Sequence, residues 1–271
     1  MITNKLNLPQ SFVNYAGSDN HEHKPNRYSV TELLKSTQEI YLSRKYDVDT
    51  DVSEIIPALF GSAVHHILEA NTVTSETLLP EYSIECELYG ITISGRIDLL
   101  NLSELTIEDY KTCSTSKKDY EDWKLQGLIY AYLVYLTKDI KIKQLRFYAI
   151  YKDWSKIRAA SSSGYPQNPV FTWTYNIDDS DFIYIDEWLK TKISDIKNEN
   201  LYCDKWYTGD KYAVYKSRTD KRATIVCDSE QEAHDYITNK LNGAGIIDVR
   251  KGENIKCKYY CKYCKECKLN D

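Results

Sequence analysis

The 271-residue sequence has no run of 18 apolar residues, the minimum that an α-helix needs to cross the hydrocarbon core of a membrane. Its first ten residues, MITNKLNLPQ, lack the pattern of a secretory signal peptide. It also lacks an internal repeat and any low-complexity segment, which excludes solenoid and fibrous architectures. From these absences we expect a chain without a membrane partner that works in the cytoplasm.

An overall excess of positive charge is also absent. The formal net charge is -5, so charge alone does not indicate a nucleic-acid-binding protein. The cations are uneven, however, because residues 247–271 hold seven Lys or Arg against four acids. Several of the 24 tyrosines lie among Lys and Arg in residues 211–218 and 256–265. Such rings could stack on bases while the cations follow phosphates, and they could equally be packing residues of strands.

Residues 95–112, GRIDLLNLSELTIEDYKT, hold the greatest concentration of chemically useful side chains. Residues 91–100 and 105–111 have the composition of strands, and residues 101–104 have that of a turn. The pattern therefore predicts a β-hairpin.

The register of this hairpin decides which side chains share a face. If the loop has an even number of residues, Asp98 lies opposite an odd-numbered residue near Ile107, and Asp98, Asp109 and Lys111 face the same side. Two carboxylates at that separation can hold a hard divalent cation, and the lysine can reach the same point. Such a site suits phosphodiester hydrolysis. Glu108 alternates to the opposite face, so Asp109 is the assigned carboxylate.

Two flanking segments have helical periodicity and place further polar residues on single stripes. In ALFGSAVHHILEA, Gly61, His65 and Glu69 recur every four residues. In DYEDWKLQGLIYAYLVYL, Gln126 and Tyr130 are also four residues apart. Each pair alone is more typical of ordinary packing or a surface position than of a site.

The order of these motifs resembles that of the PD-(D/E)xK nuclease superfamily, and in particular its RecB-type and CRISPR-associated RecB-like exonucleases from bacteria and phages. The motifs run G-x-x-x-H-x-x-x-E on a helix, G-x-x-D and D-x-K on strands, and Q-x-x-x-Y on a helix. The matching residues are Gly61, His65, Glu69, Gly95, Asp98, Asp109, Lys111, Gln126 and Tyr130. The resemblance covers residues 27–200 and, less specifically, the cysteine-rich tail.

The resemblance implies roles for these residues. His65, Asp98 and Asp109, with the main-chain carbonyl of Tyr110, would ligate catalytic Mg²⁺ or Mn²⁺, and Lys111 would position the attacking water. Glu69 matches the acidic position of the helical motif and is counted among the catalytic residues. By the same resemblance, Gln126 and Tyr130 would contact the nucleic acid or brace the site.

The C-terminal tail crowds Cys257, Cys261, Cys264 and Cys267 into eleven residues. Spacing this tight disfavours disulfides, and a thiolate-bound metal is the better account. Consecutive short spacings favour a [4Fe-4S] cluster, with Zn²⁺ as the alternative. Many RecB-like exonucleases take one cluster ligand from an N-terminal helix, but residues 27–46 contain no cysteine. All four ligands could therefore be local, or Cys203 or Cys227 could replace one of them.

We expect an α/β chain with a restriction-endonuclease-like core, in which helices flank a mixed central sheet. An irregular segment covers residues 1–26, the nuclease core residues 27–200, and a small α+β module with the cysteine site residues 201–271. Within them, residues 28–46, 55–71, 118–137 and 178–198 are predicted helices. Residues 81–111 are predicted to form a meander of three strands. Residues 142–152 and 169–176 are predicted strands, with a flexible loop at SSSGYPQNP between them.

The predicted function is a metal-dependent DNA exonuclease acting on ends or single strands, with a structural cluster and possible partner proteins in a recombination, repair or replication complex. Two alternatives are open. One is an endonuclease on the same fold, which would share every catalytic residue. The other is a catalytically silent nucleic-acid-binding accessory protein or scaffold with a zinc site.

Overall fold

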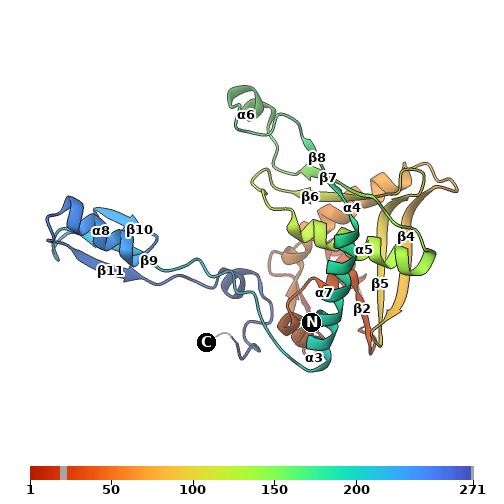
Figure 1. Ribbon diagram of the computed structural model, residues 1–271, viewed down its shortest axis with the longest axis horizontal. Coiled ribbons are helices and arrows are strands. Elements are labelled where there is room, and N and C mark those ends of the chain that lie inside the picture. The colour runs from red at the N-terminus through yellow and green to blue at the C-terminus, as the bar shows by residue number, and fades with distance from the viewer. Residues whose placement is uncertain (19–22, 270–271) are drawn as a thin grey trace. The chain divides into compact units, whose positions relative to one another are not determined.

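The computed structural model describes residues 1–18 and 23–269, and the chain divides into two compact units, residues 1–201 and 202–271. Figure 1 labels most of the elements of both units. The helices of the first unit are α1 (Gln10–Ser18), α2 (Val30–Leu33), α3 (Thr37–Lys45), η1 (Val52–Ile55), α4 (Ile56–Ala70), α5 (Glu121–Lys138), α6 (Lys156–Ser161) and α7 (Asp179–Lys197). Its strands are β1 (Ile2–Thr3), β2 (Arg27–Ser29), β3 (Thr50–Asp51), β4 (Leu78–Leu88), β5 (Ile91–Asn101), β6 (Thr106–Cys113), β7 (Gln144–Tyr151) and β8 (Val170–Asn176).

A six-stranded mixed sheet forms the framework of the first unit. Its strand order is β2-β5-β6-β7-β8, and β4 pairs with β5 in addition. The β2/β5 and β6/β7 pairs are parallel, whereas β4/β5, β5/β6 and β7/β8 are antiparallel. The predicted mixed sheet with flanking helices is thus confirmed.

Strand β5 changes partner along its length, and this change opens the sheet. One edge of β5 is paired with β4 from Leu78 to Leu88. On the other side, the ladder with β2 ends at Ser94 and the ladder with β6 begins at Leu99. The sheet therefore forks over residues 95–98, in the middle of the G-x-x-D motif.

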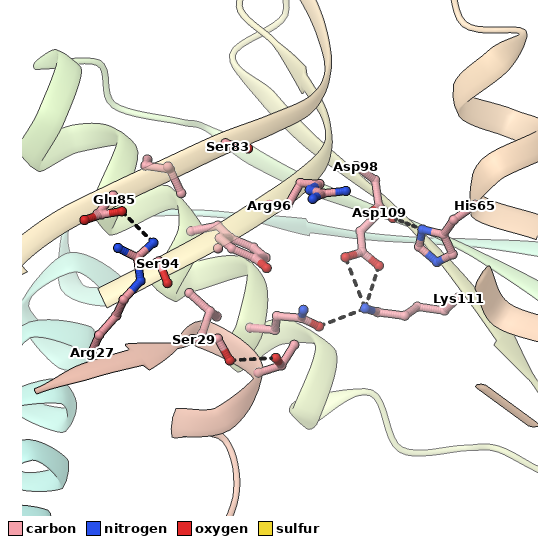
Figure 2. A pocket seen from close by; sticks show the side chains of 16 residues that line it. Arg27, Ser29, His65, Ser83, Glu85, Ser94, Arg96, Asp98, Asp109 and Lys111 are labelled. Atoms are coloured by element: carbon pink, nitrogen blue, oxygen red, sulfur yellow. Dashed lines mark hydrogen bonds and ion pairs between the residues drawn. The ribbon is translucent and has the colours of Figure 1, made fainter. Parts of the chain in front are cut away.

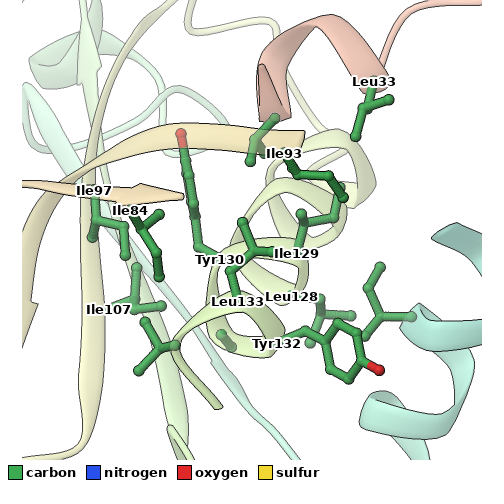
Figure 3. Close-up of a cluster of buried hydrophobic side chains, with 14 of the residues drawn as sticks. Leu33, Ile84, Ile93, Ile97, Ile107, Leu128, Ile129, Tyr130, Tyr132 and Leu133 are labelled. Atoms are coloured by element: carbon green, nitrogen blue, oxygen red, sulfur yellow. The ribbon is translucent and has the colours of Figure 1, made fainter. Parts of the chain in front are cut away.

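Helix α5 supplies much of the core, and its long apolar run explains why. Every residue from Gln126 to Val134 is buried, so the helix is covered nearly all round rather than on one stripe. Ile129 and Leu133 pack with Ile93 and Ile107 of the sheet, as Figure 3 shows. No helix in residues 1–18 and 23–269 is both long and apolar enough to cross a membrane.

The polarity of residues 1–26 predicts an irregular segment. The described part of this segment instead contains helix α1 and the short strand β1. Phe12, Val13 and Ala16 form a half-buried stripe at helical spacing. The polar residues around this short stripe make its helical pattern hard to detect in the sequence. The Tyr15 hydroxyl also hydrogen-bonds Ser62 Oγ at 3.0 Å.

The predicted helix over residues 28–46 is divided into β2, α2 and α3. Serine caps cause the division. Ser29 caps α2 by accepting the Glu32 N–H, and Ser36 forms a capping box with Glu39 at the start of α3. Helix α6 was likewise not predicted, and Ser155 caps it.

The second unit is a small three-stranded sheet with one helix. Strands β9 (Lys211–Tyr215), β10 (Ile225–Cys227) and β11 (Ile246–Arg250) pair antiparallel in the order β10-β9-β11. Helix α8 (Glu230–Lys240) packs Ala233 and Ile237 against Val214 and Cys227. A π-helical turn, η2 (Lys256–Tyr260), then leads into the cysteine-rich tail.

Candidate active site

The hairpin register has the parity that the sequence predicts. Residues 102–105 form a four-residue loop, and the ladder pairs Leu99 with Glu108 and Leu100 with Ile107. At the next position the strands separate, and the Asp98 carboxylate accepts the Tyr110 N–H at 2.8 Å. This bond replaces a ladder bond and holds the carboxylate at the fork.

Asp109 and Lys111 follow on the same face of β6, as Figure 2 shows. Lys111 Nζ lies 2.8 Å from one oxygen of Asp109 and 3.1 Å from the other. The same ammonium donates to Gln126 Oε1 at 2.8 Å. Burial raises the pKa of Asp109, which is only 5% exposed, and the charge of Lys111 opposes this rise. The lysine is therefore fixed between a carboxylate and an amide.

Helix α4 brings His65 to the other side of Asp98. His65 Nδ1 lies 3.2 Å from Asp98 Oδ2, and this contact raises the pKa of His65 against the opposing effect of burial. The imidazole also meets the Tyr110 ring edge-on, with the ring centroids 6.3 Å apart. His66, the next residue of the chain, does not line the cleft, and its side chain is 83% exposed. The spacing from Gly61 therefore selects the histidine that the structure places at Asp98.

Glu108 lies on the opposite face, as strand alternation predicts. It accepts a hydrogen bond from the Tyr148 hydroxyl at 2.8 Å and pairs with Arg146 at 3.3 Å. Both partners come from β7, so this carboxylate serves the sheet rather than the cleft.

Gln126 and Tyr130 reach the cleft from α5. Gln126 holds Lys111, and Tyr130 lies against β5 at Gly95. A Cβ at position 95 would come within 2.5 Å of Tyr130 Cε1 and 3.2 Å of Val30 Cγ2. The glycine of the G-x-x-D motif therefore allows the Tyr130 ring to occupy the fork. Burial raises the pKa of Tyr130 to about 12, so its hydroxyl stays protonated.

Glu69 does not line the cleft. Four residues of helix carry it about 6 Å along α4 from His65, and its carboxylate lies 3.9 Å from His66 instead. The carboxylate that does reach His65 and Asp98 is Glu81 of β4, which sequence reasoning missed. No local motif marks Glu81, because its position depends on the pairing of β4 with β5.

The donor set fits a divalent cation. One ligand atom from each of His65, Glu81 and Asp98 lies within 4.8 Å of the others. Asp109 lines the same cleft as His65 and Asp98. Carboxylate oxygens with one imidazole suit Mg²⁺ or Mn²⁺ better than a soft metal. The Tyr110 carbonyl stays a predicted ligand, since the contact with Asp98 is made by its N–H.

The cleft extends well beyond these residues. Its volume is about 560 Å³, and Figure 2 shows Arg27 and Arg96 on its walls with Ser29, Ser83 and Ser94. Both arginines are paired with carboxylates, Arg27 with Glu85 at 2.7 Å and Arg96 with Glu81 at 3.3 Å. The part of the cleft away from His65 thus offers cations and hydroxyl groups. Such groups are suited to binding the phosphates of a polymeric substrate.

Comparison with known proteins agrees with this geometry. Residues 58–269 match the model of the PD-(D/E)XK nuclease superfamily, and the chain belongs to that superfamily. Members of the superfamily use divalent metals. No curated protein matches the chain.

Two solved structures are similar to parts of the chain. The crystal structure of SSO0001 is 17% identical, covers 68% of this chain and 84% of its own, and has a TM-score of 0.48. A "Putative exonuclease" from Eubacterium rectale is 15% identical, with a TM-score of 0.30. That match covers 56% of this chain and 54%, about half, of the other.

Proposed function

We propose that the chain is a Mg²⁺- or Mn²⁺-dependent DNA exonuclease of the RecB type, which hydrolyses phosphodiester bonds at ends or in single strands. The observation that carries the proposal is the fork of the sheet. There Asp98, Asp109 and Lys111 meet His65 in an open cleft with polar walls. Membership of a nuclease superfamily supports the same chemistry.

Each side chain has a distinct task in this proposal. His65, Asp98 and Asp109 would hold the cation, which when bound neutralises phosphate charge and acidifies a water. Lys111 presents an ammonium whose position is set by Asp109 and Gln126. A donor fixed in this way orients the attacking water and stabilises charge in the transition state without reorganising. Tyr130 fills the fork and keeps β5 and α5 in place.

The direct test is digestion of end-labelled linear DNA, single-stranded and double-stranded, beside a covalently closed single-stranded circle. With Mg²⁺ or Mn²⁺ present, we expect the linear DNA to be degraded and the circle to survive. The Lys111→Ala variant should degrade the linear DNA at least about 100-fold more slowly. Cleavage of the circle would identify an endonuclease. Binding without cleavage of any substrate, matched RNA included, would favour a silent accessory protein.

The second unit has the charge of a nucleic-acid-binding module. Residues 202–271 contain 14 Lys and Arg against 11 Asp and Glu, whereas residues 1–201 contain 21 against 29. The β9–β10 connection, residues 216–224, concentrates this charge in Lys216, Arg218, Lys221 and Arg222. All four are exposed, and within residues 1–18 and 23–269 none forms an ion pair. Unpaired exposed cations can neutralise phosphates at little desolvation cost.

Removing two of these cations should weaken substrate binding without touching chemistry. For the double variant Lys221→Gln, Arg222→Gln we expect a raised KM, an unchanged kcat, and a salt dependence of single-strand binding that is shallower by about 1.4 in log–log slope. The control double variant, Lys190→Gln with Lys240→Gln, loses the same charge from exposed helix positions. Equal slopes for the two double variants would contradict a role for the β9–β10 connection.

Four cysteine thiols that lie near one another in the second unit support a thiolate-bound metal. Burial raises the pKa of the Cys257 thiol, and the nearby thiols of Cys203, Cys264 and Cys261 raise it further. Metal binding would relieve this crowding, since a cation stabilises thiolates. Cys227 packs in the small core beside Val214 instead. We propose a structural [4Fe-4S] cluster on Cys257, Cys261 and Cys264, with Cys267 or Cys203 as the fourth ligand.

Protein purified without oxygen should therefore be brown and contain about four iron atoms per chain, as thiolate-bound clusters do. Cys261→Ser should lower thermal stability before it affects cleavage, because the metal closes the tail onto its own unit. The iron content of the Cys267→Ser and Cys203→Ser variants identifies the fourth ligand, because only loss of a ligand should lower it. The Cys86→Ser variant is the control and should keep the iron content of the parent. Colourless protein with stoichiometric zinc would replace the cluster by a zinc site, and metal-free stable protein would contradict both.

A further inference from the structure

Glu81 occupies an unusual position in β4. The ladder with β5 pairs Pro80 with Leu99 and Tyr82 with Ile97, so Glu81 lies opposite Asp98. Its backbone has φ of +46°, in the left-handed region that residues with a side chain rarely adopt, while the ladder is regular on both sides. A glycine at this position would adopt the conformation more easily. A glutamate here therefore carries a backbone cost that a glycine would not.

The conformation turns the Glu81 carboxylate toward the fork. Its ligand atom lies within 4.8 Å of those of His65 and Asp98, although the three residues come from β4, α4 and β5. Asp109, in contrast, is engaged through both oxygens by Lys111. The ligand atoms that converge in the structure are therefore those of His65, Glu81 and Asp98.

We propose that Glu81 is a ligand of the catalytic divalent cation, so that His65, Glu81 and Asp98 form the site at which the cation first binds. This inference rests on the proposed function. The ion pair between Arg96 and Glu81 holds the carboxylate in the absence of a cation, and it is weak enough to yield because the Arg96 side chain is 68% exposed and 3.3 Å away. Binding of the cation would release Arg96 into the polar cleft that it lines.

The test is Mn²⁺ affinity of the full-length protein, measured by titration calorimetry and by electron paramagnetic resonance without nucleic acid. We expect Glu81→Gln to lower the affinity at least tenfold at unchanged melting temperature, since the amide keeps the shape but not the charge. Glu81→Gly should lose the affinity as well while melting at the same or a higher temperature, because glycine accepts the left-handed backbone. Arg96→Gln should bind Mn²⁺ as well as the parent chain or better.

Glu87→Gln is the matched control, because it removes the same charge from an exposed position of β4 that does not line the cleft. We expect its Mn²⁺ affinity to stay within about twofold of the parent. Parent-like affinity in Glu81→Gln, with affinity lost in Asp98→Asn, would overturn the assignment of Glu81 and leave the proposed nuclease site standing. Absence of Mn²⁺ binding in the parent chain would overturn the proposed function itself.

Discussion

Replacing Asp98 or Asp109 by Asn should reduce cleavage below detection while the fold persists. In either variant a single carboxylate from the hairpin is left, and Mg²⁺ is held poorly by so few oxygen ligands. The amide introduced by Asp98→Asn can still accept the Tyr110 N–H, so the fork should form. Melting temperature and cleavage of end-labelled DNA, measured on the same preparations, separate the loss of chemistry from loss of structure.

Nucleic-acid binding should survive in these variants, or strengthen, because removing a carboxylate reduces repulsion of the phosphates. Glu108→Gln provides the control. Its residue lies next to Asp109 in the chain, and the amide keeps an acceptor for Tyr148 on the far face of the sheet. We expect this control to cleave like the parent. Turnover at the parent rate in both Asp variants would contradict the assignment of the site.

Lys111→Ala should slow the chemical step by about 100-fold or more, the scale typical of losing one positioned donor or proton-handling group. Single-turnover cleavage at saturating metal measures this step directly. Mn²⁺ affinity should be largely kept, because the lysine contributes no ligand.

Lys111→Arg distinguishes charge from geometry. The planar guanidinium is larger than an ammonium and distributes its charge over a fork, so it does not fit between Asp109 and Gln126 in the same way. We expect poor rescue. Full activity in the arginine variant would show that positive charge alone suffices and that the position of Nζ is unimportant.

Local signals in the sequence determined the elements that carry most of the site. Strand composition and loop parity predicted that Asp98, Asp109 and Lys111 share a face, because side-chain direction in a strand has a strict period of two. The resemblance to the nuclease superfamily selected His65, because this histidine holds the family spacing from Gly61. These are properties of neighbouring residues, so no knowledge of distant contacts was needed.

Tertiary structure decided what depends on pairing between distant segments. Glu81 and Asp98 are joined only by the β4–β5 ladder, and the fork arises only because β2 and β6 take different ends of β5. Glu69 shows the converse, since its helical spacing from His65 is regular, yet the rise of the helix carries it past the cleft. Periodicity specifies the direction of a side chain, whereas the neighbours that it meets are set by the packing of the whole chain.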